Sequence, residues 1–246
     1  MAISLRDVTV SFLTKESGIV VACDSSASIG LKIADQLKVD PKITSAFCLR
    51  VALLEVLAIG GEPVIVINSV GGEMEPTGRQ SLAGIKAELR AANLEHVGLN
   101  GSTEENILTK MTSIAVTVIG TITKATIKYG RILAGSSLYQ VGLPLVGAEV
   151  IQQRDQIFTY QDLGEIQKNP SVLEILPVGS KGIFYEATQL AKSSGLGVSL
   201  TEKQGSFSKS AGPATVLLVA LEPGAKLELV NQEIFVKKIG CFDKEG

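Results

Sequence analysis

The chain has 246 residues, of which 45% are hydrophobic, only 4% are aromatic and 25 are glycines. This length predicts one or two domains, of which we expect two, and the many glycines favour an α/β protein over a helix bundle. The net charge is −2, with 23 basic and 25 acidic residues intermixed, so nucleic acid and anionic membranes are poor partners.

Neither the apolar stretches nor the cysteines indicate a secreted or membrane protein. No uncharged apolar stretch approaches 18 residues, and the N-terminus has no signal-peptide pattern. The three cysteines are odd in number and far apart, which disfavours disulfides and a Cys-based zinc site. We therefore expect a cytoplasmic protein that acts on a small molecule.

The first half of the chain alternates between strands and helices. The expected strands cover residues 5–13, 18–23, 64–70, 97–99 and 113–122. A helix over 43–59, opened by Pro41 and ended by Gly60-Gly61, is apolar nearly all round. A second, amphipathic helix over 77–93 begins with a capping box of Thr77 and Gln80.

Shorter elements follow from Tyr129 onward. The expected strands cover 138–141, 173–178, 198–200, 215–221 and 234–239, and the expected helices 147–156, 162–168 and 179–194. This change to shorter elements places the domain boundary near Lys128, giving an N-terminal domain over 1–128 and a C-terminal domain over 129–246.

An acidic turn after the strand 18–23 is the first candidate site. Asp24 begins it, mostly small residues follow (Ser25 to Ser28, then Gly30), and Lys32 closes it. A carboxylate at a strand end can hold Mg²⁺, small residues let backbone N–H groups approach phosphate oxygens, and a lysine adds positive charge. The alternative is a turn with a local side-chain-to-backbone hydrogen bond.

Glu55 is the second candidate, because a carboxylate inside an apolar helix needs a partner. Arg50 lies about 140° away around the helix and fits poorly, so a metal ion or another salt bridge remains open. Asp24, Glu55 and the loop 102–105 lie at strand ends or on the helix between them. Since strand carboxyl ends meet at one sheet edge, these groups could converge on one Mg²⁺-nucleotide site, whereas Glu73 and Glu75 are expected to be solvated.

Other catalytic motifs are missing or incomplete. His96 is the single histidine and no Gly-x-Ser-x-Gly elbow is present, which excludes most nucleophilic triads and leaves His96 structural or solvent-facing. A Walker A loop is absent. The segment Gly179-Ser180-Lys181-Gly182 could receive an anion at a helix start, or could be an ordinary strand-to-helix turn.

The collinear order of these motifs resembles the PurM-like superfamily of aminoimidazole ribonucleotide synthetase, thiamine monophosphate kinase, selenophosphate synthetase and the hydrogenase maturation dehydratase. Residues 24–33 look like its Asp-Gly-x-Gly-Thr-Lys segment, and 51–63 like its acidic helix closed by Gly-Ala-x-Pro. Residues 100–105 look like Gly-Gly-x-Thr-x-Glu, and 177–183 like its Asp-x-Ser-Asp-Gly-Gly-Leu turn.

The resemblance implies an α/β (α+β) two-domain fold: an N-terminal mixed sheet with helices, which dimerises through its strands, and a smaller α+β C-terminal domain. It also implies ATP and Mg²⁺ as cofactors of a homodimer. The implied metal ligands are Asp24, Glu55 and Glu105, and the implied catalytic residues are Asp24, Lys32 and Glu55. The implied nucleotide contacts are Ser25, Gly30, Lys32, Gly101, Ser102, Thr103, Glu105, Gly179, Ser180, Lys181 and Gly182.

Within the superfamily, the segments 209–215 and 142–150 look most like the alpha-ribazole kinase branch. That likeness implies an ATP-dependent kinase that phosphorylates alpha-ribazole, a nucleoside used in cobalamin biosynthesis. A thiamine monophosphate kinase or an aminoimidazole ribonucleotide synthetase-like enzyme is the alternative. A non-catalytic nucleotide-binding protein is a third reading, because Ser102 and Lys181 stand where the family often has acids.

Overall fold

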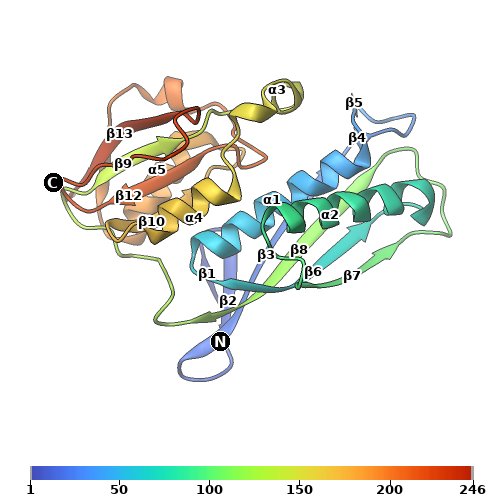
Figure 1. The fold of residues 1–246 in the computed structure, drawn as a ribbon, viewed down its shortest axis with the longest axis horizontal. Coiled ribbons are helices and arrows are strands. Elements are labelled where there is room, and N and C mark those ends of the chain that lie inside the picture. The colour runs from blue at the N-terminus through green and yellow to red at the C-terminus, as the bar shows by residue number, and fades with distance from the viewer. Residues whose placement is uncertain (1, 245–246) are drawn as a thin grey trace. The chain divides into compact units, whose positions relative to one another are not determined.

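The fold was obtained as a computed structural model, which describes residues 2–244. The chain divides into two compact units, of which the first ends at Thr126 and the second begins at Ile127. We call them unit 1 and unit 2 (Figure 1). The division falls two residues before the boundary that the sequence predicts at 128 (128 − 126 = 2).

Unit 1 is built on a mixed sheet whose strand order over the described residues is β1-β2-β3-β8-β6-β7. Only β6 and β7 pair in parallel, and the other neighbours are antiparallel. The strands are β1 (Ala2–Leu5), β2 (Val8–Phe12), β3 (Ser17–Ala27), β6 (Glu62–Val70), β7 (Gly98–Thr103) and β8 (Ser113–Thr123).

Two helices, α1 (Pro41–Ala58) and α2 (Arg79–Ala91), lie on one face of this sheet (Figure 1). Along β8 every second residue from Ile114 to Ile122 is buried, and a Cβ on Gly120 would lie 3.1 Å from a methyl group of Val56 in α1. The core of unit 1 therefore lies between the sheet and α1. The opposite, open face of the sheet carries the alternate residues.

The strands extend further than the sequence predicts. β3 runs to Ala27 and pairs with β8 at every residue, so Asp24 lies within a strand rather than after its end. The segment 100–103, expected as a loop, continues β7 and pairs with β6. Both extensions consist mainly of small polar residues, which show no hydrophobic alternation. Such strands are held by backbone hydrogen bonds to their neighbours, so the sequence pattern does not predict them.

The helices agree with the predicted spans but differ at their ends. Asp40 caps α1, because its side chain accepts from the Lys42 N–H at 2.8 Å. The capping box predicted for α2 is wrong: a short π-helical segment, η1 (Met74–Gly78), precedes α2, and Thr77 bonds Glu73 instead. The expected single strand over 5–13 is also wrong, since a turn divides it into β1 and β2.

The segment between β3 and α1 contains two short strands, β4 (Ile29–Gly30) and β5 (Leu37–Lys38), which pair in parallel. In the sequence this stretch reads as a plain connector because neither strand exceeds two residues. The connector is the part of unit 1 that carries Lys32.

Unit 2 holds a second sheet, in the described part of the chain ordered β10-β12-β9-β13-β11 and antiparallel throughout. The helix α5 packs Ile183, Ala187 and Leu190 into the same buried cluster as Leu218 and Phe242 of the sheet. The strands are β9 (Ser137–Val141), β10 (Val172–Pro177), β11 (Gly197–Leu200), β12 (Leu217–Leu221) and β13 (Val236–Asp243). The helices are α3 (Ala148–Gln152), η2 (Arg154–Gln156), α4 (Tyr160–Lys168), α5 (Gly182–Ser193) and η3 (Gln204–Phe207).

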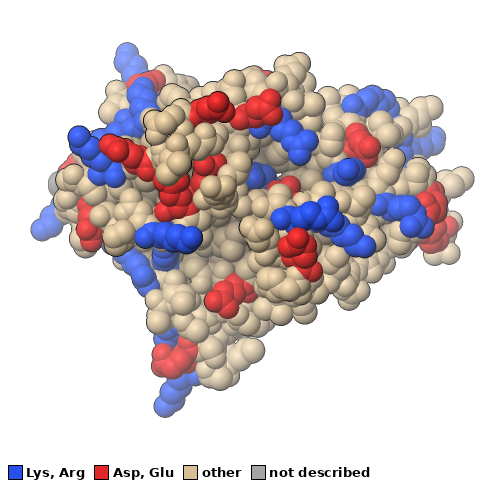
Figure 2. All heavy atoms as spheres, viewed as in Figure 1, with Lys and Arg blue, Asp and Glu red and all other residues tan. Residues whose placement is uncertain are grey.

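The surface charges and the helices bear on the kinds of partner that the sequence disfavours. Basic and acidic side chains are intermixed over the face shown in Figure 2. Among the described helices, none combines the length and the hydropathy that a membrane crossing requires.

Candidate functional site

Asp24 lies on the helix-facing side of β3, in phase with the buried Val20 and Ala22. Burial raises the pKa of this carboxyl above its usual range, although the Cys48 thiol of α1 and the backbone N–H of Ser25 donate hydrogen bonds to it. The Cys48 thiol is buried, and its pKa is raised by that burial and by the neighbouring negative charge. A partly desolvated carboxylate of this kind is stabilised when a cation approaches it.

The connector after β3 is fastened to the start of β8 by Asp35, which is 5% exposed. Its carboxylate accepts from the backbone N–H of Lys32 at 2.7 Å and from the N–H and hydroxyl of Thr112 at 2.7 and 2.8 Å. Burial alone would raise the pKa of Asp35, but these hydrogen bonds and the Lys38 charge outweigh it and lower the pKa. A Cβ on Gly30 would lie only 2.0 Å from the Thr112 hydroxyl, so glycine is required there.

The ammonium group of Lys32 is held inside unit 1. Its Nζ lies 2.5 Å from Glu73 Oε2 and 2.5 Å from Thr109 Oγ1, and the lysine side chain is 13% exposed. The Thr77 hydroxyl donates to Glu73 Oε1 at 2.5 Å. Burial would raise the pKa of Glu73, but the hydrogen bonds from Lys32 and Thr77 prevail and lower it to about 2. Glu73 is therefore an anchored, charged partner and not the solvated loop residue that the sequence suggests.

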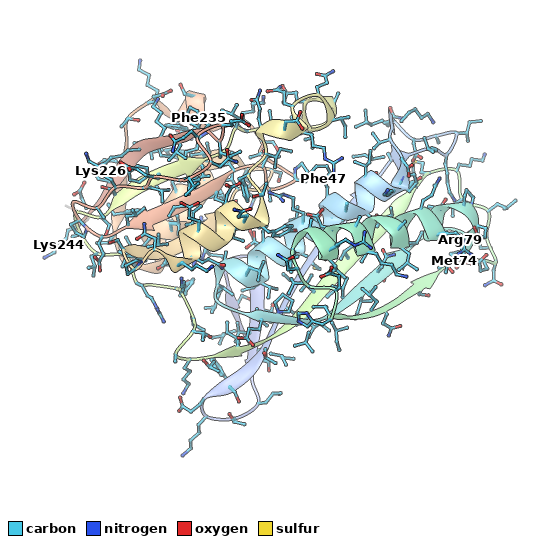
Figure 3. The ribbon with its side chains drawn as sticks, viewed as in Figure 1. Phe47, Met74, Arg79, Lys226, Phe235 and Lys244 are labelled. Atoms are coloured by element: carbon cyan, nitrogen blue, oxygen red, sulfur yellow. The ribbon has the colours of Figure 1, made fainter. Side chains whose placement is uncertain are left out.

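The end of β7 lies against the same segment. Glu105 Oε1 accepts from the Met74 N–H at 2.7 Å and from the Thr103 hydroxyl at 2.9 Å, and the Glu104 N–H donates to the Gly72 carbonyl at 2.8 Å. Figure 3 labels Met74 where this segment leads into α2. Of the predicted residues, the structure thus brings Lys32, Thr103 and Glu105 to the two sides of the segment 72–77. Gly101 and Ser102 directly precede Thr103 in β7.

The three predicted metal ligands do not gather in this way. Asp24 is beside Cys48, whereas Glu55 follows Cys48 by seven residues, about 10.5 Å further along α1. Glu55 is half-buried rather than enclosed, and Arg50 pairs with Glu88 of α2 at 3.8 Å. Across residues 2–244, no three His, Cys, Asp or Glu side chains are grouped so that they could hold a metal ion. Asp24, Glu55 and Glu105 therefore do not form a metal site within one copy of the chain.

The second predicted phosphate segment is the turn between β10 and α5 in unit 2. Ser180 and Lys181 are exposed, and Lys181 Nζ lies 4.2 Å from the centre of the Tyr185 ring. Gly182 has φ +80°, and a Cβ there would lie 2.8 Å from the carbonyls of Phe207 and Lys209. The Ala211 N–H donates to the Gly179 carbonyl at 3.2 Å. The turn is thus packed on the loop 207–211 and presents a cation at the start of α5.

Glu73, Asp35 and Thr109 are the residues that sequence reasoning missed. All three lie in polar loops, where a charged residue is most often solvated. The loops between β3 and α1 and before β8 come together only through backbone pairing, such as Ala34 N–H to the Lys110 carbonyl at 2.9 Å. The sequence carries no periodic signal for that pairing.

Residues 6–122, nearly all of unit 1, match the family described as AIR synthase related protein, N-terminal domain. No curated protein matches the whole sequence closely enough to be compared. The family match spans all the predicted site residues of unit 1, from Asp24 in β3 to Glu105 just after β7.

Known structures with the same fold include two small-molecule enzymes. Thiamine monophosphate kinase from Aquifex aeolicus aligns with a TM-score of 0.66 and 16% identity, over 98% of this chain and 89% of that protein. Its complex with AMPPCP and TMP aligns with a TM-score of 0.65 and 15% identity, over 97% and 85%. PurL from Thermotoga maritima, complexed with ATP, aligns with a TM-score of 0.68 and 13% identity over 96% of this chain, which spans only 42% of PurL.

These similarities confirm the predicted fold class. The chain has the mixed α/β fold of thiamine monophosphate kinase, with both sheets included in the alignment. At such low identity the likeness is one of architecture.

Proposed function

We propose that the protein is an ATP-dependent enzyme of the PurM-like class and, more specifically, a kinase of a small alcohol. One observation carries this proposal: the predicted motifs occur in the family's order on a chain that spans 89% of a thiamine monophosphate kinase with the same fold. A phosphoryl-transfer site works mainly through positioning and charge, which suits a site built from a lysine, small residues and backbone N–H groups.

In this proposal the connector after β3 and the end of β7 receive the nucleotide. Lys32 is the phosphate contact, Gly30 and Ser25 allow close approach, and Thr103 and Glu105 border the same segment. The turn around Lys181 in unit 2 is a separate candidate for binding an anion. Each of these roles follows from the resemblance and awaits the test below.

Mg²⁺, if bound with the nucleotide, would neutralise part of the phosphate charge. The grouped three-carboxylate ligand set that was predicted is not formed within one copy, so no reaction step is assigned to it. Asp24 is the carboxylate that we propose for the cation, because burial disfavours its charged form and raises its pKa, and a cation nearby would stabilise that charge.

Alpha-ribazole is the proposed phosphoryl acceptor, on the likeness of segments 142–150 and 209–215 to the alpha-ribazole kinase branch. Thiamine monophosphate is the competing acceptor, because a thiamine monophosphate kinase is among the similar structures. Incubation of the protein with ATP, Mg²⁺ and each acceptor in turn, followed by detection of the phosphorylated product, separates the two. ADP binding without ATP loss in either mixture would instead support a non-catalytic nucleotide-binding protein.

We further propose that the active form is a homodimer that pairs the open sheet faces of unit 1. The central positions of this face are apolar or small and carry no charge, and Ile65 is 38% exposed. They include Val21 and Cys23 of β3, Thr117 and Ile119 of β8, and Ile65 and Ile67 of β6. An uncharged sheet face of this size is typical of an interface.

Substitution of Asp24 tests the site directly. Asp24→Asn keeps the shape of the side chain but removes its charge, and we expect the ATP-dependent rate to fall by a factor of about 100 or more. Asp7→Asn, in the exposed turn between β1 and β2, is the matched control and should retain the rate. Initial rates over a range of Mg²⁺ concentrations, with circular dichroism to verify folding, provide the measurement; a wild-type rate for Asp24→Asn would remove Asp24 from the site.

A further inference from the structure

The Lys32 ammonium already has partners inside unit 1. Two of its three N–H donors are directed to Glu73 and Thr109, each at 2.5 Å, and little of its side chain reaches solvent. A phosphate group that approached Lys32 would therefore meet a neutralised lysine and not a free positive charge.

The Glu73 carboxylate is itself fixed in place. Thr77 donates to the oxygen that Lys32 does not contact, and the Glu73 side chain is 31% exposed, so it is more accessible than the lysine it pairs with. At Gly72 a Cβ would lie 2.7 Å from Lys32 Nζ, so the lysine ammonium lies directly against this turn. These contacts define one arrangement: a lysine enclosed by a turn, with a carboxylate on its more exposed side.

We propose that Glu73 neutralises Lys32 in the ligand-free protein and competes with anions for it, so that a phosphate group gains this ammonium only by displacing the Glu73 carboxylate. The proposal deepens the proposed function and rests on its assignment of Lys32 as a phosphate contact. The binding free energy of a weakly held anion such as inorganic phosphate does not offset the cost of breaking the Lys32–Glu73 ion pair. A polyphosphate carries more negative charge and is attracted to the ammonium more strongly, so it offsets this cost more readily.

Binding of inorganic triphosphate, measured by calorimetry at low salt without any acceptor, tests this inference. Glu73→Gln preserves the size of the side chain and frees the lysine charge, so we expect triphosphate to bind about tenfold more tightly than to the wild type. Glu75→Gln is the matched control: it removes the same charge two residues away, from a carboxylate that pairs with Arg79 at the surface. The control should bind triphosphate as the wild type does.

A double variant shows whether the gain acts through Lys32. In Lys32→Met/Glu73→Gln the tighter binding should disappear, with both variants retaining the wild-type circular dichroism spectrum. The inference is overturned if Glu73→Gln binds no tighter, if Glu75→Gln gains as much, or if the gain survives in the double variant. Absence of a phosphorylated product with any acceptor would count against the proposed kinase activity but leaves this binding result unaffected.

Discussion

The ion pair between Lys32 and Glu73 links the stability of unit 1 to pH. The pKa of Glu73 falls from 4.5 to about 2 on folding, because its hydrogen bonds outweigh the effect of burial. A carboxyl with a lowered folded-state pKa contributes stability that is complete above its unfolded pKa and is lost as pH falls toward the folded value. The contribution of Glu73 should therefore be constant above about pH 5 and decline as the pH is lowered toward 2.

Glu73→Gln isolates this contribution. We expect the variant to be less stable than the wild type at pH 7, and the difference in unfolding free energy to shrink between pH 4.5 and pH 2.5. Urea denaturation at a series of pH values provides the measurement, and Glu62→Gln, at the exposed start of β6, controls for loss of a carboxylate. Asp35 also has a lowered pKa, but it is present in both proteins and cancels in the difference. A difference that does not change with pH would contradict the assignment.

The candidate residues differ in how far the sequence could predict their surroundings. Lys32 and Thr103 could be placed near one another because their motifs occur in a known order. The partner of Lys32 could not, since Glu73 stands in a loop between η1 and β6 and its contact depends on the fold of two other loops. Asp24 was assigned to a strand end, and the backbone pairing of β3 with β8 as far as Ala27 corrects that placement.

At the level of elements, the contact between α1 and α2 depends on one glycine. A Cβ on Gly84 of α2 would lie 2.0 Å from the Lys42 carbonyl and 2.3 Å from the Ser45 hydroxyl, and this hydroxyl donates to the Ser81 carbonyl at 2.8 Å. Because the nearest atom is backbone, a methyl group forces the helices apart. We expect Gly84→Ala to lower the unfolding free energy by about 2 kcal/mol, since the clash exceeds the gain in helix propensity.

Gly164→Ala is the matched control for that prediction. Gly164 lies within α4 and no heavy atom stands within 4 Å of the added Cβ, so alanine should be neutral or stabilise by about 0.5–1 kcal/mol. Thermal denaturation of both variants, followed by circular dichroism, makes the comparison. Equal melting temperatures for the two variants would show that the helices adjust to the extra methyl group without cost.

The elements themselves illustrate what sequence patterns carry. The apolar run that predicts α1 and the alternation that predicts β8 are both confirmed, because α1 is buried around most of its circumference and β8 buries every second residue. The ends of β7 and the beginning of α2 escaped prediction. The end of β7 is set by its pairing with β6, and the start of α2 by the hydrogen bond of Thr77 to Glu73. Both contacts involve polar or small residues, which leave no hydrophobic pattern in the sequence.

On the scale of the whole molecule, the two units have different roles in the proposal. Unit 1 carries the proposed site residues Asp24 and Lys32, and unit 2 carries a separate candidate anion site, the turn with Lys181. Both lie within the alignment to thiamine monophosphate kinase, whereas the family match is confined to residues 6–122. The order of motifs could therefore be read from the sequence in both halves, but the family match supports it in unit 1 alone.

The open face of the unit 1 sheet yields the last prediction. Thr117 occupies the central strand β8, between Cys23 of β3 and Ile67 of β6, and its side chain projects away from the helices. Thr117→Arg places a charge at the middle of the proposed dimer interface, where it would be buried without a partner, yet in a single copy the same arginine faces water. We therefore expect the variant to fold normally and to elute as a monomer.

Size-exclusion chromatography with light scattering, over a range of protein concentrations, distinguishes monomer from dimer. Thr201→Arg, an exposed position after β11 in unit 2, is the control and should remain dimeric like the wild type. If Thr117→Arg stays dimeric, the copies associate through another surface. If it becomes monomeric and also loses ATP-dependent turnover while its melting temperature is unchanged, then pairing of the sheets is required to complete the site. This outcome would agree with the described residues of a single copy, which contain no grouped set of metal ligands.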